Sequence, residues 1–95
     1  MIISNLINKQ GNSVKSQFVI IEGNKTIFQS YNSKIVEIEG TWITFYPNYN
    51  YSTTTSKHRN KFLSDVLGVD ITSKDVEKMI KDKKYNNFNV ILINE

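Results

Sequence analysis

The chain has 95 residues, a net charge of +3 and an ordinary apolar content, so we expect residues 1–95 to form a single compact domain with one small core. It lacks cysteine, which excludes disulfides, thiolate nucleophiles and cysteine-based metal sites. No apolar run approaches the roughly 20 residues that span a bilayer, and Met1–Ile7 lacks the basic leader of a signal peptide. The mild positive charge permits an anionic partner and argues against a DNA mimic.

The first half of the chain is rich in β-forming residues. Residues 1–13 carry apolar side chains at helical spacing but consist of mediocre helix formers, so a strand, a helix and a docked arm are all open. Four β-rich runs follow, separated by turns that contain glycine, asparagine or serine, and they predict a four-stranded antiparallel meander. These runs are 14–21, 26–31, 34–39 and 41–46. Alternation in the third run places Glu37 and Glu39 on a water-facing side.

A helix is predicted after the meander. It begins near Ser52–Thr55, where several residues are good N-caps, and it runs to Leu67. Gly68 follows at the position where a left-handed residue often ends a helix. The apolar positions of this helix predict a stripe that packs against the sheet. The stripe consists of Phe62, Leu63, Val66 and Leu67.

A second helix and a last strand complete the predicted fold. Thr72 or Ser73 caps the helix, which extends over 73–84 with acidic residues in its first turn and lysines at its end, as the helix dipole favours. The near-continuous apolar run 88–93 predicts a central strand that is covered on both faces. We therefore expect an α+β fold, with a mainly antiparallel sheet of about five strands and two helices on one face.

The residues with reactive side chains do not form a recognisable catalytic motif. His58 is the only histidine, and a hydrolase built on serine and histidine needs a buried carboxylate behind the base. A single histidine without cysteine also makes a poor transition-metal site. We therefore expect no catalytic residues, no metal site and no cofactor, with His58 half-exposed at the edge of the core.

A basic cluster at the start of the first helix is the strongest candidate for binding. Lys57, Arg59 and Lys61 follow a run of serine and threonine, and a helix N-terminus with hydroxyls and cations can bind an anion. Tyr49 and Tyr51 lie nearby in sequence, and exposed aromatic rings beside cations can stack on the bases of single-stranded nucleic acid. These five residues and His58 are the predicted binding residues. Alternatively, the tyrosines pack the loop onto the sheet and the cations are solvated.

Two segments of the chain resemble a known group of proteins. They are Phe28–Val36, with the pattern SYxSxI, and Tyr51–Leu63, with the pattern YSxTTSKHxxxFL. Together they are similar to a family of short, uncharacterised domains that are common in phages and prophages of low-GC bacteria. The absence of alanine and the abundance of isoleucine, asparagine and lysine fit such an AT-rich origin. The family has no assigned activity, so the resemblance implies no catalytic residue.

The resemblance does suggest a class of function, because small phage accessory proteins without catalytic residues often inhibit host defence. We therefore expect a non-catalytic protein in the cytoplasm of a bacterial host, which binds a host protein or ribonucleoprotein as an anti-CRISPR or other anti-defence protein does. The alternative is a small nucleic-acid-binding module that uses the basic cluster at 57–61. A third possibility is an assembly protein that oligomerises through an exposed strand; the sequence leaves the target and the oligomeric state open.

Overall fold

The computed structural model describes residues 1–94 and contains seven strands and two helices in that range. In chain order the first five strands are β1 (Ile2–Ile7), β2 (Ser13–Glu22), β3 (Lys25–Ser30), β4 (Ser33–Glu39) and β5 (Trp42–Phe45). The remaining elements are α1 (Thr53–Leu67), α2 (Ser73–Asp82), β6 (Lys84–Tyr85) and β7 (Phe88–Leu92).

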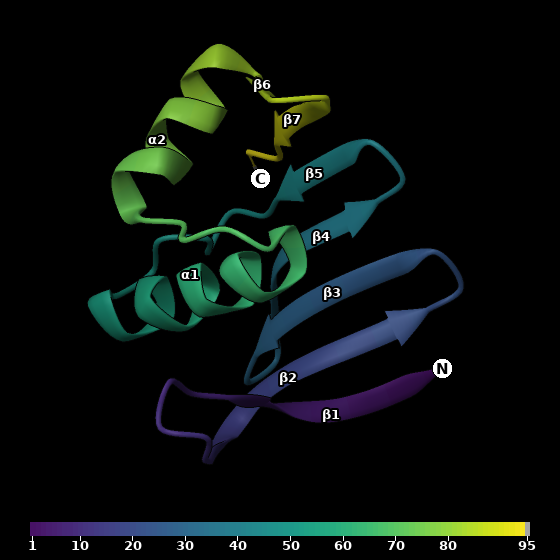
Figure 1. Cartoon of the computed structure of the whole chain (residues 1–95), viewed down its shortest axis with the longest axis vertical. Helices are drawn as coiled ribbons and strands as arrows, with labels where there is room; N and C mark the ends of the chain where they lie inside the picture. The colour runs from purple at the N-terminus through teal and green to yellow at the C-terminus, as the bar shows by residue number, and fades with distance from the viewer. Residues whose placement is uncertain (95) are drawn as a thin grey trace.

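All seven strands form one mixed sheet in the order β1-β2-β3-β4-β5-β7-β6 (Figure 1). Strands β1 to β5 follow one another as antiparallel neighbours, so the predicted meander from β2 to β5 is confirmed. The fold is α+β, but the prediction of a mainly antiparallel sheet of about five strands is wrong. The sheet has two more strands than expected, and β7 pairs with β5 in parallel.

The two unexpected strands lie at the edges of the sheet. The segment that the sequence left open forms β1, which pairs with β2 along one side only. The second edge strand, β6, falls where the sequence predicted the end of a helix. Helix α2 instead stops at Asp82 because Lys83 adopts a left-handed conformation with φ 57°, and its N–H bonds the Met79 carbonyl. Lysine rarely occupies that conformation, so the sequence carried no stop signal there.

The parallel pairing of β7 follows from the two helices between it and β5. Together α1 and α2 return the chain to the end of the sheet where β5 began, and a strand that starts there runs in the same direction as β5. Strand β7 is one position in from the edge, between β5 and the two-residue β6. Val90 is buried but Ile91 is 44% exposed, so the prediction that this strand is covered on both faces is wrong.

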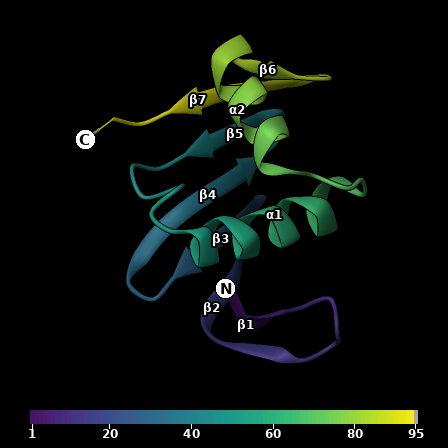
Figure 2. The same cartoon turned by 90° about the vertical axis from the view of Figure 1, so that its left-hand side faces the viewer.

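Both helices pack on the same face of the sheet (Figures 1 and 2). The core lies between them and the strands, where the Phe28 ring of β3 stacks on the Phe62 ring of α1 with centroids 5.7 Å apart. The predicted stripe of α1 is correct for Phe62 and Leu63, which are buried, and wrong for Val66, which is 40% exposed. Helix α1 also buries Thr55 and Arg59, so its buried stripe extends toward the N-terminus of the helix.

The opposite face of the sheet differs from the prediction at one glutamate. Glu37 was expected to face water, but its side chain is largely buried among its neighbours. It accepts a hydrogen bond from the Tyr46 hydroxyl at 3.3 Å and lies 3.5 Å from the Lys34 ammonium. Strand alternation predicted the correct side of the sheet but could not predict that aromatic and basic neighbours would cover the carboxylate.

Candidate functional site

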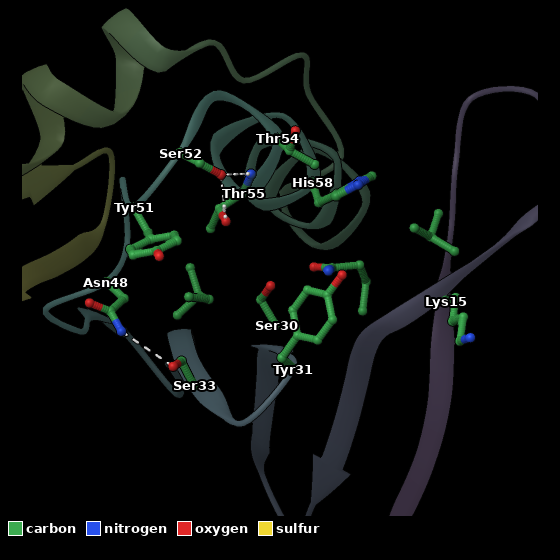
Figure 3. A pocket seen from close by; sticks show the side chains of 13 residues that line it. Lys15, Ser30, Tyr31, Ser33, Asn48, Tyr51, Ser52, Thr54, Thr55 and His58 are labelled. Atoms are coloured by element: carbon green, nitrogen blue, oxygen red, sulfur yellow. Dashed lines mark hydrogen bonds between the residues drawn. The ribbon is translucent and has the colours of Figure 1, made fainter.

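A pocket of about 680 Å³ lies between the first turns of α1 and the adjoining end of the sheet (Figure 3). Side chains from six parts of the chain line it: the start of β2, the end of β3, the β3–β4 turn, β4, the loop before α1, and α1 itself. The lining residues are Val14, Lys15, Gln17, Ser30, Tyr31, Ser33, Ile35, Asn48, Tyr51, Ser52, Thr54, Thr55 and His58. Both segments that carry the family resemblance, Phe28–Val36 and Tyr51–Leu63, contribute most of this lining.

The inner wall of the pocket combines two polar side chains with one apolar side chain. Gln17 of β2 pairs in register with Ser30 of β3, and both are buried. Ile35 of β4 is fully buried beside them and belongs to the hydrophobic core. Gln17 is only 4% exposed, yet its Oε1 has no hydrogen-bond partner among the described residues. A buried acceptor without a partner costs about 1–3 kcal/mol, so this atom marks a place where a donor from a ligand would bind favourably.

The first turn of α1 forms the opposite wall. Ser52 is the N-cap, and its Oγ accepts the N–H of Thr55 at 3.0 Å, while its hydroxyl donates to the Thr55 Oγ1 at 3.1 Å (Figure 3). The amino end of a helix carries a partial positive charge. None of the thirteen described residues that line the pocket is acidic, whereas Lys15 is basic. The pocket therefore has a positive electrostatic bias.

Two exposed tyrosines flank the pocket. Tyr31 lies in the tight β3–β4 turn and is 66% exposed, and Tyr51 precedes α1 and is 77% exposed. Figure 3 shows the two rings on opposite sides of Ser30. Tyr31 is held in a left-handed conformation with φ 53°, and its N–H bonds the carbonyl of Ser16, which also has a positive φ. The backbone of this turn is therefore fixed by β2, and the ring of Tyr31 is presented to solvent.

The structure separates Arg59 from the other two cations of the predicted cluster, Lys57 and Lys61, which both line a second pocket beside α1. Arg59 is 2% exposed and points inward, where its guanidinium donates to the Tyr49 carbonyl at 2.7 Å, to Asn60 Oδ1 and to Ser73 Oγ. These bonds connect the loop before α1 to the start of α2. Arg59 is thus a buried structural residue and does not present its charge to solvent.

The other predicted binding residues also take different environments. Lys61 is paired with Asp65 one turn later, with the nearest atoms 2.6 Å apart. Tyr49 is half-buried and packs edge-on against Phe45, so the alternative reading, in which it packs the loop onto the sheet, is correct for this residue. Lys57 and Tyr51 are exposed. Of the six predicted residues, Tyr51 and His58 line the pocket, and Lys57 adjoins His58.

His58 lies at the pocket wall and is half-buried, as expected. Burial lowers its pKa from the ordinary value of 6.5, and the positive charge of Lys57 lowers it further. The imidazole is therefore neutral at pH 7 and can donate one hydrogen bond and accept another. No carboxylate among residues 1–94 is hydrogen-bonded to it, and these residues contain no group of three or more histidine, cysteine, aspartate or glutamate side chains that could hold a metal ion.

Several residues of the pocket had no direct indication in the sequence. Gln17 directly precedes the apolar run Phe18–Ile21 and lies on the same side of β2 as Val19, so the available signal was a polar residue at an inward-facing position. Ser30 ends β3, Ser33 begins β4 and Asn48 lies in the loop before α1, and only the tertiary fold brings them together. Asn48 Nδ2 donates to Ser33 Oγ at 3.2 Å across 15 residues. Neither helix within residues 1–94 has the length and apolar character that crossing a membrane requires.

The chain matches one described protein family. A family of unknown function, DUF8033, matches residues 1–85, which include every element of the fold except β7. No curated protein and no solved structure matches the chain. The chain therefore belongs to DUF8033, and its pocket has to be interpreted from its own residues.

Proposed function

We propose that this member of DUF8033 is a non-catalytic binding protein of the bacterial cytoplasm, which acts as a phage-type inhibitor by binding a protein or ribonucleoprotein of a host defence system. The observation that supports this proposal is the exposed surface around the start of α1. Tyr31 and Tyr51 are exposed at the pocket, and Lys57 is exposed next to His58, which lines it. Exposed aromatic side chains beside a concave surface are typical of the residues that dominate binding energy in protein interfaces.

The geometry favours this function over a nucleic-acid-binding module that uses the basic cluster at 57–61. Phosphate contacts need cations that reach the backbone of a nucleic acid together. Arg59 is buried among oxygen acceptors, and Lys61 is paired with Asp65. Only Lys57 of the three is both exposed and outside the ion pairs found among the described residues. One exposed lysine supplies too little charge for strong binding to a phosphate backbone.

The proposal is tested by capturing partners from a bacterial host lysate with tagged protein, with and without nuclease. We expect a defined host protein to be retained after nuclease treatment. The double variant Tyr51→Ala, Lys57→Glu should lose this partner because it removes the exposed ring and reverses the charge beside the pocket.

A matched control is Lys78→Glu on α2, where the lysine pairs with Asp82 at the surface. This variant should retain the partner. If nuclease removes every captured protein, the domain binds nucleic acid and the proposal is wrong. If the double variant captures the partner as well as the unchanged protein does, the binding surface lies elsewhere.

A further inference from the structure

We propose that the pocket between α1 and the sheet binds a nucleoside phosphate, either as a free nucleotide or as the terminal nucleotide of a strand. Because the pocket shares the start of α1 with the proposed partner surface, this assignment rests on the proposed function for the location of the binding surface. It adds the chemical class of a ligand that the purified domain would bind without the partner.

Gln17 provides the first observation. Its side-chain amide is enclosed by the sheet and lines the pocket, and Oε1 has no hydrogen-bond partner among residues 1–94. An unpartnered buried acceptor is costly unless a ligand supplies the donor. The exocyclic amine of a nucleobase is such a donor, and glutamine recognises adenine through its N6 amine and N7. Gln17 would therefore contact the base.

The charge of the pocket provides the second observation. Ser52, Thr54 and Thr55 bring the positive end of α1 to one wall, and the cationic Lys15 also lines the pocket. None of the described lining residues carries a negative charge that would oppose an anion. Hydroxyls, a helix amino end and a nearby cation are the groups that commonly bind phosphate in proteins. The phosphate would therefore lie toward α1.

The flanking rings and the size of the pocket complete the match. Tyr31 and Tyr51 stand at opposite sides of Ser30 in Figure 3, and both are largely exposed, so either ring can stack on a planar base. The pocket volume of about 680 Å³ lies within the range of small-molecule sites. The pocket combines an unpartnered amide oxygen, the positive amino end of α1 and two exposed aromatic rings. This combination fits a nucleoside phosphate better than an inorganic anion alone.

The test uses purified ¹⁵N-labelled protein, titrated separately with adenosine 5′-monophosphate, adenosine and inorganic phosphate. We expect adenosine monophosphate to shift the amide signals of Ser30, Tyr31 and the first turn of α1, and to bind about tenfold or more tightly than adenosine because of its charge-assisted hydrogen bonds. A pentaadenylate with a 5′-phosphate forms a fourth arm. Tighter binding of this strand identifies a terminal nucleotide as the ligand, and equal binding identifies the free nucleotide.

The variant Gln17→Met separates a ligand contact from a structural role. It should weaken binding of adenosine monophosphate about tenfold, the equivalent of one lost hydrogen bond. It should leave the melting temperature unchanged or raise it, because an unpartnered buried acceptor is replaced by an apolar side chain of similar shape. The matched control is Gln10→Met in the exposed β1–β2 turn, which should change neither quantity.

Three results would overturn the assignment. The first is the absence of pocket shifts with both adenosine monophosphate and the oligonucleotide. The second is equal binding of inorganic phosphate and the nucleotide. The third is a Gln17→Met variant that binds normally but melts at a much lower temperature. None of these results affects the capture of a host protein, and failure to capture a partner leaves the titration unchanged, so the two proposals can fail separately.

Discussion

At the scale of single residues, the environment of a side chain decides its role more than its neighbours in sequence do. Arg59 and Lys61 are two positions apart, yet one is buried in a set of hydrogen bonds and the other is in a surface ion pair. Residues two apart on a helix point about 200° apart, so they face different surroundings. A cluster of like charges in a helical sequence is therefore a weak predictor of a cluster in space.

The structural role of Arg59 leads to a stability prediction. Arg59→Met should lower the free energy of unfolding by about 3 kcal/mol, because the Tyr49 carbonyl and the side chains of Asn60 and Ser73 lose a charged donor in a buried place. Lys61→Met removes only a partly exposed ion pair and should cost less than about 1 kcal/mol. Urea denaturation of the two variants measures the contrast. Equal losses would show that Arg59 has no special structural role.

His58 leads to a prediction about pH. Because its pKa is lowered in the folded protein by burial and by Lys57, the folded state binds fewer protons than the unfolded state once the pH falls through 6.5. Stability from this group is therefore fully present above pH 6.5 and decreases as the solution becomes more acidic, until the folded pKa is passed. Urea denaturation at a series of pH values should show this decrease.

The variant His58→Gln isolates the contribution of the imidazole. In this variant the free energy of unfolding should vary less with pH just below 6.5, because glutamine does not titrate. An identical pH dependence in the variant and the unchanged protein would contradict the lowered pKa. A direct titration of the His58 ring signals by NMR should give a midpoint below 6.5.

At the scale of elements, the sequence predicts the capping residues of the helices well, but it predicts only in part which side of α1 packs against the sheet. Ser52 and Thr72 are the N-caps, and Thr72 forms a capping box with Asp75. Gly68 ends α1 in a left-handed conformation with φ 75°. These signals act over three or four residues, which is why the sequence predicts them well. The direction in which a helix faces the sheet depends on distant residues.

The facing of α1 is tested by two truncations four residues apart. Phe62→Ala should lower the free energy of unfolding by about 3–5 kcal/mol, because the ring is buried and stacks on Phe28. Val66→Ala removes a side chain that is already 40% exposed and should cost less than about 1 kcal/mol. Thermal and urea unfolding measure both. A larger loss for Val66→Ala than for Phe62→Ala would show that Val66, one turn further along the same side of α1, packs more closely on the sheet than Phe62 does.

At the scale of the whole molecule, the sheet is completed by a strand from the far end of the chain. Strand β7 inserts between β5 and β6, and Val90 belongs to the common core. Backbone hydrogen bonds also join β7 to other segments. The N–H of Asn89, for example, donates to the Thr41 carbonyl at 2.7 Å. The family match ends at residue 85, ahead of this strand. The matched region alone therefore lacks a strand that its neighbours need.

A truncated chain tests this dependence. A chain that ends at Tyr85 should lose its cooperative thermal transition, because β5 is left with an unpaired inner edge, β6 has no partner and the core loses Val90. A chain that ends at Ile93 retains all of β7 and should melt as the full chain does. Circular dichroism measures both. A cooperative transition at an unchanged temperature in the shorter chain would show that β7 contributes little to the fold.

Much of the local structure, and part of the candidate site, could be predicted from the sequence. The β2–β5 meander and the starts of both helices follow from turn residues, β-rich runs and caps. Strand β6 was missed because Lys83 ends α2 without the glycine or asparagine that usually marks such a stop. For the candidate site, the motif at Tyr51–His58 contributes one wall of the pocket, but Gln17 and Ser30 could not be connected to it from the sequence, because strand pairing brings them there.

The sequence by itself determined the elements whose signals are local: the antiparallel meander, the capped helices, the small size and the absence of cysteine chemistry. The tertiary structure decided the order of the strands, the parallel pairing of β5 with β7, the burial of Arg59 and the assembly of the pocket. The physical reason is the range of the interactions. Turns and caps depend on bonds between residues a few positions apart, whereas strand order and burial depend on contacts among residues that are distant in the chain.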